Sequence, residues 1–380
     1  MISLGKSLIS CLDALDGMLS YKFRLYPSKT AQAKLQKHLE LCKWLYNRLL
    51  EELNKAKSEE RKITQRETQA LIVKLKEERP ELKQVYSKAL QMVNYQLWSS
   101  IKALSELKKK GKKVGKLRFK GKWFKTMNYN QLGFKLEGKK LIFSKIGEIP
   151  IKLHRFLDGK VKGVIIKREN SGKWYAIFQV ESETKPLPKT NKVIGIDLGV
   201  KHFLTDSEGR QIENPCFYQR TLAKIKIVQH WLSKKKEGSK NREKQRLKLI
   251  RLYEKLVSQR NDFLHKLSRF YVNNYDVICV ENLSIRNMVR NRNLAKKILD
   301  ASWGKFLQLL VYKAERADKQ VMKVNPRGTS KERKEIRNRD YRASLNILER
   351  GLSGLGRPFE PVEMVYQQTS SLKQEAPSVR

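Results

Sequence analysis

Short apolar runs separated by long helical stretches constrain the fold of this chain more than any other feature. VIGID (193–197) and YDVICV (275–280) have the composition of buried strands, and QVMKV (320–324) is typical of a short strand. Two further short strands are expected at 201–206 and 210–213, flanking a turn. Because helical patterns fill the intervals, the sequence predicts an α/β domain in this half of the chain.

The predicted order of elements narrows the class of this domain. Three strands come first, then two long helices at 220–269 that form a hairpin split at Gly238 and Ser239, a strand, a helix at 301–317, a strand and a final helix at 336–351. This order is that of ribonuclease-H-like α/β domains, although element order alone says little about function. We place the domain at residues 188–352.

The first half has two kinds of pattern. Residues 19–26 alternate as a strand does, residues 30–107 have helical periodicity, and strands follow at 140–153 and 162–182. We therefore expect a strand-rich domain made of 19–29 and 116–187, interrupted by a helical domain at 30–115. Residues 1–18 are interpreted as an N-terminal extension and residues 353–380 as a C-terminal tail, since neither has periodic patterning.

Charge identifies the class of partner. The 82 Lys and Arg outnumber the 38 Asp and Glu, which gives a formal net charge of +44. Such a field argues against an enzyme of small metabolites and for a polyanion such as nucleic acid. Residues 220–269 hold 16 cations and 4 acids, and residues 108–125 hold ten cations, no acid and three aromatic residues. No apolar stretch is long enough to span a membrane.

Three acidic residues stand where catalytic carboxylates would be expected. Asp197 ends the first strand of the α/β domain, Glu281 follows the strand 275–280, and Asp340 lies near the start of the last helix. Taken singly, each is commonly a turn or cap residue. If the two strands are neighbours and the helix packs beside them, the carboxylates converge, and three carboxylates can hold the divalent cations that phosphodiester hydrolysis uses.

Several segments resemble TnpB, the RNA-guided nuclease of small insertion sequences and a relative of type V CRISPR effectors. The resemblance runs from about residue 19 to the end and rests on six segments. They are YKFRLYP (21–27), IGIDLGV (194–200), VENL (280–283), ASWG (301–304), VNPRGTS (324–330) and RDYRASLNI (339–347).

The resemblance implies a fold, an activity and a set of site residues. The fold would be a multidomain α/β protein, in which a helical recognition lobe interrupts a wedge β-barrel and a RuvC-like nuclease domain follows. Asp197, Glu281 and Asp340 fall on the family's catalytic and metal-binding positions, so Mg²⁺ or Mn²⁺ is expected. The protein would use a guide RNA from the transposon end to cut double-stranded DNA beside a short motif.

Nucleic-acid contacts are expected on the basic segments and near the DNA motif. The resemblance places Gln91 and Thr126 near that motif. Lys120 and Trp123 belong to the basic aromatic run, and Lys235 and Arg242 to the basic helices. The aromatic residues Phe119, Trp123 and Phe124 could equally be packing residues.

One departure from the family concerns zinc. Members of the family usually carry a four-cysteine zinc ribbon before the last catalytic Asp, but only nine residues, KERKEIRNR, separate Ser330 from Asp340 here. No zinc is therefore expected. This departure keeps a second hypothesis open, an RNA-guided DNA-binding regulator with weak or no cleavage, and a third is a guide-independent RuvC-type nuclease. The expected location is the cytoplasm of a prokaryote, in association with the nucleoid.

Overall fold

The computed structural model describes residues 18–329 and 336–354, which form two compact units. The first comprises the chain up to Thr184 together with residues 231–251, and the second comprises residues 185–230 and the chain from Leu252 onward. Apart from Met18, Ser353 and Gly354, the predicted N-terminal extension and C-terminal tail lie outside the described residues. Within these residues, every helix lacks the length or the hydropathy needed to cross a membrane.

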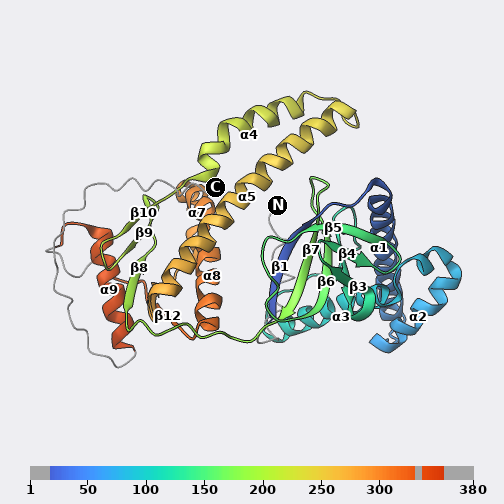
Figure 1. The fold of residues 1–380 in the computed structure, drawn as a ribbon, viewed down its shortest axis with the longest axis horizontal. Coiled ribbons are helices and arrows are strands. Elements are labelled where there is room, and N and C mark those ends of the chain that lie inside the picture. The colour runs from blue at the N-terminus through green and yellow to red at the C-terminus, as the bar shows by residue number, and fades with distance from the viewer. Residues whose placement is uncertain (1–17, 330–335, 355–380) are drawn as a thin grey trace. The chain divides into compact units, whose positions relative to one another are not determined.

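The first unit contains a curled antiparallel sheet of seven strands (Figure 1). Its order is β2-β6-β7-β1-β5-β4-β3. The strands are β1 (Met18–Leu25), β2 (Thr126–Asn130), β3 (Phe134–Glu137), β4 (Lys140–Phe143), β5 (Gly147–Lys152), β6 (Lys160–Arg168) and β7 (Trp174–Glu181). The sheet nearly closes on itself, since the ring of Tyr129 in the first strand of this order lies 5.0 Å from that of Phe143 in the sixth. The predicted β-barrel is thus confirmed.

Helices interrupt this barrel between β1 and β2, as the resemblance implies. They are α1 (Lys29–Ser58), α2 (Gln65–Glu78), the short 3₁₀ helix η1 (Pro80–Gln84) and α3 (Ser87–Lys109). The buried face of α1 includes Leu35, Leu39 and Tyr46, and belongs to the same hydrophobic core as the barrel strands. The Thr64 and Glu67 side chains form a capping box at the start of α2. Burial of apolar area therefore holds the helices and the barrel together.

The second unit contains a five-stranded mixed sheet in the order β10-β9-β8-β11-β12. The strands are β8 (Val193–Asp197), β9 (His202–Asp206), β10 (Gln211–Glu213), β11 (Val277–Glu281) and β12 (Gln320–Val324). β11 runs parallel to both β8 and β12, whereas β9 is antiparallel to β8 and to β10. Numbered from β8, the order is 3-2-1-4-5, which confirms the predicted ribonuclease-H-like sheet.

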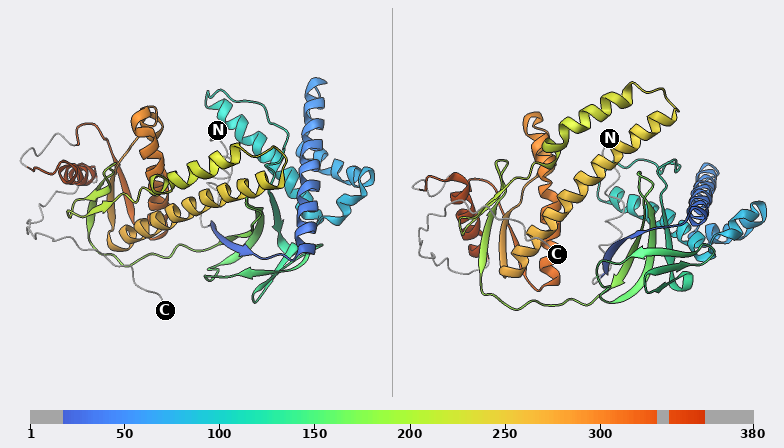
Figure 2. Two further views of the ribbon diagram at one scale, coloured as in Figure 1. Left: turned by 90° about the horizontal axis from the view of Figure 1, so that it is seen from above. Right: turned by 45° about the horizontal axis from the view of Figure 1, so that its top comes forward.

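Helices cover both faces of this sheet. The helices that follow β10 are α4 (Phe217–Ser233), α5 (Lys240–Asn274), α6 (Ile285–Met288), α7 (Arg292–Ala301), α8 (Trp303–Arg316) and α9 (Arg339–Ser353), of which α5, α8 and α9 contribute to the cores on the two faces. Ile278 and Val280 of β11 share a core with residues of α5 and α8, whereas Val277 and Cys279 share a core with α9. Side chains of a strand alternate between its two faces, so this split gives a three-layer α/β/α unit, which Figures 1 and 2 show.

The two long basic helices form the hairpin that the sequence predicts. Gly238 lies in the turn between them with φ +79°, in the left-handed region that glycine adopts without strain. Nη1 of Arg242 donates to the backbone oxygens of Leu232 and Lys235, at 3.1 and 2.9 Å. Arg242 therefore closes the turn of the hairpin.

A charged clamp fixes the start of the second unit. The carboxylate of Asp276, just before β11, accepts hydrogen bonds from the backbone and hydroxyl of Thr190 and from the buried ammonium of Lys319. These donors hold the pKa of the Asp276 carboxyl well below its usual value, although desolvation opposes them. The ionised carboxylate therefore ties the segment that leads into β8 to the sheet.

Candidate active site

Two carboxylates lie at the carboxyl ends of neighbouring parallel strands. Asp197 is the last residue of β8 and Glu281 the last of β11, and Ile196 of β8 pairs with Val280 of β11. Gly195 of β8 and Cys279 of β11 face α9. Asp197 and Glu281 each lie two residues further along the same strand, so they point to the same face of the sheet. Both acidic side chains thus belong to the α9 side of the sheet. Glu281 was expected just after its strand and instead ends it.

The third carboxylate, Asp340, is the second residue of α9. Asn338 is the N-cap, and its Oδ1 accepts from the backbone N–H groups of Asp340 and Tyr341 at 3.1 and 3.2 Å. The capping oxygen is therefore that of Asn338, which leaves the Asp340 carboxylate free of this role. The cap role that is common for an acidic residue near a helix start is therefore filled by Asn338 and not by Asp340.

Two glycines let α9 pack directly on the strands that carry the other two acids. A Cβ added at Gly195 of β8 would lie 2.8 Å from the backbone nitrogen of Leu348, and closer still to the Ser344 oxygen. A Cβ at Gly351 of α9 would lie 2.8 Å from Cβ of Cys279 in β11. Real Cβ atoms essentially never approach other atoms so closely. The absence of these two side chains sets the position of the helix that bears Asp340.

The acidic residues interact electrostatically. Burial raises the pKa of Asp197 from 3.8 to about 7, and the charges of Glu281 and Asp340 add to the rise. Burial also raises the pKa of Glu281, although a hydrogen bond from Thr329 opposes the rise. A cation would relieve this desolvation and repulsion. Among the described residues, however, no group of three His, Cys, Asp or Glu side chains is already closed around a common metal position.

Glu281 has a hydroxyl partner that the sequence did not single out. Oγ1 of Thr329 donates to Oε1 of Glu281 at 2.6 Å, and Nδ2 of Asn346 donates to the backbone oxygen of Thr329 at 2.7 Å. All three residues are buried. Thr329 lies in the VNPRGTS segment that carries part of the resemblance, which was the one signal that could have pointed to it.

The basic aromatic run holds two of the predicted nucleic-acid contacts. The Trp123 side chain is 70% exposed, and the Lys125 ammonium lies 5.1 Å from the centre of its ring. Phe119 is also exposed, so packing does not explain these two aromatic residues, whereas Phe124 packs against the core. Lys120 is half-buried with its ammonium 4.7 Å from the Tyr46 ring centre, and desolvation lowers its pKa.

The other four predicted contacts lie on different elements. Gln91 is exposed on α3, and Thr126 is the half-buried first residue of β2, paired with Lys167. Lys235 lies in the turn of the helical hairpin with its ammonium 5.9 Å from the Trp231 ring centre. The Arg242 guanidinium is already bonded to backbone oxygens of that turn. All six contacts remain predictions.

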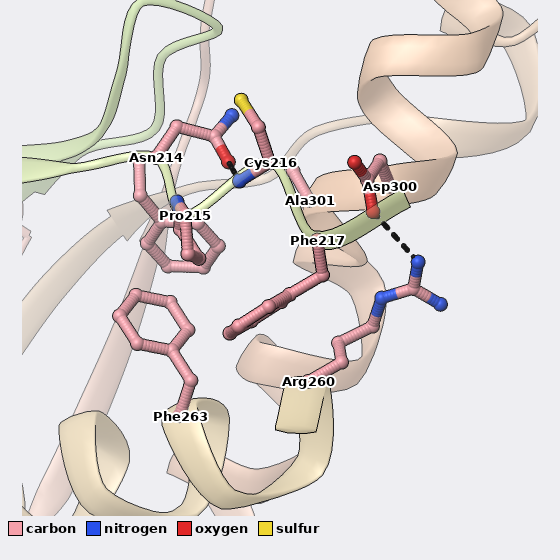
Figure 3. A pocket seen from close by; sticks show the side chains of 9 residues that line it. Asn214, Pro215, Cys216, Phe217, Arg260, Phe263, Asp300 and Ala301 are labelled. Atoms are coloured by element: carbon pink, nitrogen blue, oxygen red, sulfur yellow. Dashed lines mark hydrogen bonds and ion pairs between the residues drawn. The ribbon is translucent and has the colours of Figure 1, made fainter. Parts of the chain in front are cut away.

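A small pocket in the second unit has a structural role (Figure 3). Phe203, Phe217 and Phe263 line it beside an ion pair of 2.7 Å between Arg260 of α5 and Asp300 of α7. The Asp300 carboxylate also accepts from the backbone N–H of Tyr218, at the start of α4. The pair thus anchors the base of the helical hairpin, and none of the three candidate catalytic acids lines the pocket.

Three family models match different parts of the chain. The OrfB model of IS605, described as a probable transposase, matches residues 177–292, and its helix-turn-helix model matches residues 18–62. The span of the helix-turn-helix model contains β1 and the whole of α1. The Cas12f1-like TNB domain model matches residues 303–343, a span without Cys or His and hence without the usual zinc ligands.

Curated relatives match nearly the whole chain. A Streptomyces pristinaespiralis protein named "Putative RNA-guided DNA endonuclease" is 28% identical and covers 94% of this chain and 96% of its own length. InsQ of Escherichia coli (strain K12), which bears the same description, is 28% identical over 91% of this chain and 98% of its own. Among solved structures, the cryo-EM structure of the Cas12f1-sgRNA-target DNA complex aligns at 14% identity and TM-score 0.47, covering 83% of this chain and 82% of that one.

The sheet has the strand order of the ribonuclease-H fold, and acidic residues lie at the ends of β8 and β11 and in the last helix, α9. These features together define a RuvC-like domain. Nucleases of this class generally depend on divalent metal ions. The matches to the IS605 family models and to relatives over almost its full length confirm the predicted resemblance of the chain to the TnpB proteins of insertion sequences.

Proposed function

We propose that this chain is an RNA-guided DNA endonuclease of transposon origin, which hydrolyses DNA phosphodiesters beside a short recognised motif. The observation that carries the proposal is the placement of Asp197, Glu281 and Asp340. The three residues come from distant segments, and their carboxylates lie at one end and on one face of the sheet. There the charges of Glu281 and Asp340 add to the effect of burial in raising the pKa of Asp197. The names of the full-length relatives support the same activity.

The donor set fits a hard divalent cation. All three side chains offer carboxylate oxygens, the ligand type that Mg²⁺ and Mn²⁺ prefer. Burial, together with repulsion from Glu281 and Asp340, raises the pKa of Asp197, and both effects would be relieved by a bound cation. Asp197, Glu281 and Asp340 would hold Mg²⁺ or Mn²⁺, which when bound stabilises the negative charge that develops in phosphodiester hydrolysis. No zinc is part of the proposal.

The remainder of the chain would bind nucleic acid. The proposed partners are a guide RNA from the transposon end and a double-stranded DNA target. Base pairing with the guide RNA would select the target sequence. The cations of α4 and α5, together with Lys235 in the turn between them, would contact phosphates, and Trp123 would stack on a base. Gln91 and Thr126 would lie near the recognised DNA motif, and Lys120 of the basic aromatic run would contact the nucleic-acid backbone. Action on chromosomal DNA would place the protein with the prokaryotic nucleoid.

The test begins with the RNA that copurifies with the full chain from a host carrying its insertion sequence. Sequencing that RNA supplies the guide, and a plasmid library of randomised flanks beside the matching target supplies the motif. Cleavage is expected only when the RNA, a matched target and Mg²⁺ are all present. Asp197→Ala should abolish cleavage and retain RNA-dependent binding of the target, measured by a gel shift.

Each alternative gives a different result in this assay. A DNA-binding regulator would bind the matched target with guide RNA and leave it uncut, which the missing zinc ribbon favours. A guide-independent nuclease would cut without RNA. Cleavage that persists in Asp197→Ala would remove Asp197 from the mechanism.

A further inference from the structure

The loop after β12 forms a bracket that reaches the candidate active site. This bracket comprises residues 325–329, and it ends at Thr329, whose hydroxyl donates to Glu281 at 2.6 Å. Thr329 is 4% exposed and Glu281 is 8% exposed. A hydroxyl bonded to one carboxylate oxygen restricts rotation of the carboxylate, so the bracket limits the directions in which Glu281 can point.

Helix α9 holds the bracket in place from the other side. Asn346 donates from Nδ2 to the Thr329 oxygen at 2.7 Å, and Arg350, one turn later, donates from Nη1 to the Arg327 oxygen at 2.8 Å. Asn346 is fully buried. Within the bracket, Oδ1 of Asn325 accepts from the Arg327 N–H at 3.0 Å, and Gly328 has φ +84°, which glycine adopts readily. The position of the Thr329 hydroxyl is therefore set by α9.

The same helix begins with Asp340. A chain of hydrogen bonds thus runs from α9 through Asn346 and Thr329 to Glu281, while Asp340 projects from the first turn of that helix. One rigid element consequently fixes two of the three candidate ligands, one directly and one through the bracket.

We propose that Thr329, held by Asn346, is a positioning residue that orients Glu281 toward the divalent cation. This inference rests on the proposed function, because it requires the three carboxylates to hold a cation. Thr329 acts through Glu281 and contacts neither the substrate nor the cleaved bond. Residues that bond to metal ligands typically contribute 10- to 100-fold to metal affinity.

The test measures Mn²⁺ binding to the full chain after removal of nucleic acid with nuclease and high salt. Electron paramagnetic resonance measures free Mn²⁺, and its decrease gives the amount bound. The component of Mn²⁺ binding that is lost in Asp197→Ala defines the site. Thr329→Val keeps the shape of the side chain and removes the hydroxyl. It should weaken this component by about tenfold or more, whereas Thr329→Ser, which keeps the hydroxyl, should stay close to wild type.

Thr190→Val is the matched control. Thr190 also bonds through its hydroxyl to a carboxylate, that of Asp276, but at the opposite end of the same strand β11. The Thr190→Val variant should bind Mn²⁺ with the affinity of the wild type. Thermal melting of each variant without metal reports whether the fold is intact, and Asn346→Ala provides a second variant that is expected to weaken Mn²⁺ binding without removing the hydroxyl.

A kinetic measurement separates positioning from general damage. Cleavage by Thr329→Val should recover toward the wild-type rate as Mn²⁺ is raised, whereas cleavage by Asp197→Ala should not. If the wild type binds Mn²⁺, Asp197→Ala does not, and both Thr329→Val and Asn346→Ala bind as the wild type does, the inference is wrong and the proposed function stands. A wild-type chain without Asp197-dependent binding would overturn both.

Discussion

Gly351 of α9 lies directly against Cys279 of β11, with no room for a side chain between them. A Cβ on residue 351 would lie 2.8 Å from Cβ of Cys279 and closer still to its sulfur. Cys279 is fully buried and precedes Glu281 by two residues on the same face of the strand. The contact therefore controls how closely the helix with Asp340 approaches the strand with Glu281.

Gly351→Ala should destabilise the protein and reduce cleavage. The added methyl group forces the helix away from β11, and overpacking of this kind typically costs about 1–3 kcal/mol of unfolding free energy. Denaturant titration checks the loss. Gly304→Ala is the control, because a Cβ there meets no atom closer than 3.9 Å, and it should leave stability close to wild type.

The size-compensating double variant Gly351→Ala/Cys279→Ala should recover part of the stability. Removing the sulfur opens space for the new methyl group, so the two changes should be coupled in a double-mutant cycle. Purely additive losses would show that the contact does not determine the packing of α9.

Asp197→Asn should stabilise the metal-free chain at alkaline pH. The pKa of Asp197 is raised from 3.8 to about 7 in the folded state. Between these values the folded state holds a proton that the unfolded state has released, so the wild-type unfolding free energy falls as pH rises. Asn mimics the protonated form and removes this dependence. Denaturant titrations in EDTA should show similar stabilities near pH 4 and a gain of about 1–3 kcal/mol for the variant at pH 8. A constant difference across this range would contradict the assignment.

Lys313→Met should remove a pH dependence of stability between neutral and alkaline pH. Lys313 of α8 is 4% exposed, and burial lowers its pKa from 10.5 to about 8, with the charge of Arg269 adding to the effect. Between pH 8 and 10.5 the unfolded state binds more protons, so wild-type stability should rise through this window. The variant loses the hydrogen bonds from Nζ to the His265 oxygen and to Oγ of Ser268 at every pH, so the test is the pH dependence: its stability relative to wild type should fall by about 1–3 kcal/mol between pH 7 and pH 10.5.

The control for Lys313 is Lys266→Met on α5. Lys266 is exposed and paired only with Asp262 on the surface, so its loss should change stability by less than about 0.5 kcal/mol. Equal pH dependence in the wild type and in Lys313→Met would show that Lys313 titrates normally.

Trp123→Ala should weaken RNA binding and leave the fold intact. Trp123 is 70% exposed beside the Lys125 ammonium, and a stacked base contributes about 1–3 kcal/mol to binding. Filter binding should therefore show a loss of about tenfold, with an unchanged melting temperature. Phe156→Ala removes another exposed aromatic residue of the first unit, 96% exposed, and serves as the control. Phe124→Ala, by contrast, should lower the melting temperature because Phe124 packs against the core.

Local patterns predicted the strands of the α/β unit because period and composition act over a few residues. VIGID became β8, the run before Glu281 became β11, and the glycine-containing turn between the basic helices was found at Gly238. The alternation of side chains along these strands also determines which face of the sheet carries Asp197 and Glu281. Strand β2 was missed because TMNYN contains mostly polar residues, and its alternating burial appears only once the barrel forms.

Tertiary contacts were beyond reach of the same reasoning. The bond between Thr329 and Glu281 joins residues 48 positions apart, and no spacing rule selects a threonine for a carboxylate. Arg242 is predicted from its charge to contact nucleic acid, and the hydrogen bonds of its guanidinium to the hairpin turn could not be predicted in this way because they depend on the fold of its neighbours. Charge predicts the class of partner, whereas the role of each cation depends on which acceptor the fold brings to it.

Because Asn346 and Arg350 grip the bracket at Thr329 and Arg327, and Asn338 starts α9 on the other side, the connection between Thr329 and Asn338 has both ends anchored. Lengthening a connection between anchored ends costs little, about 0.6 kcal/mol for each doubling of its length. An insertion or deletion between residues 329 and 338 should accordingly leave both anchors, and with them the geometry of the acids, undisturbed.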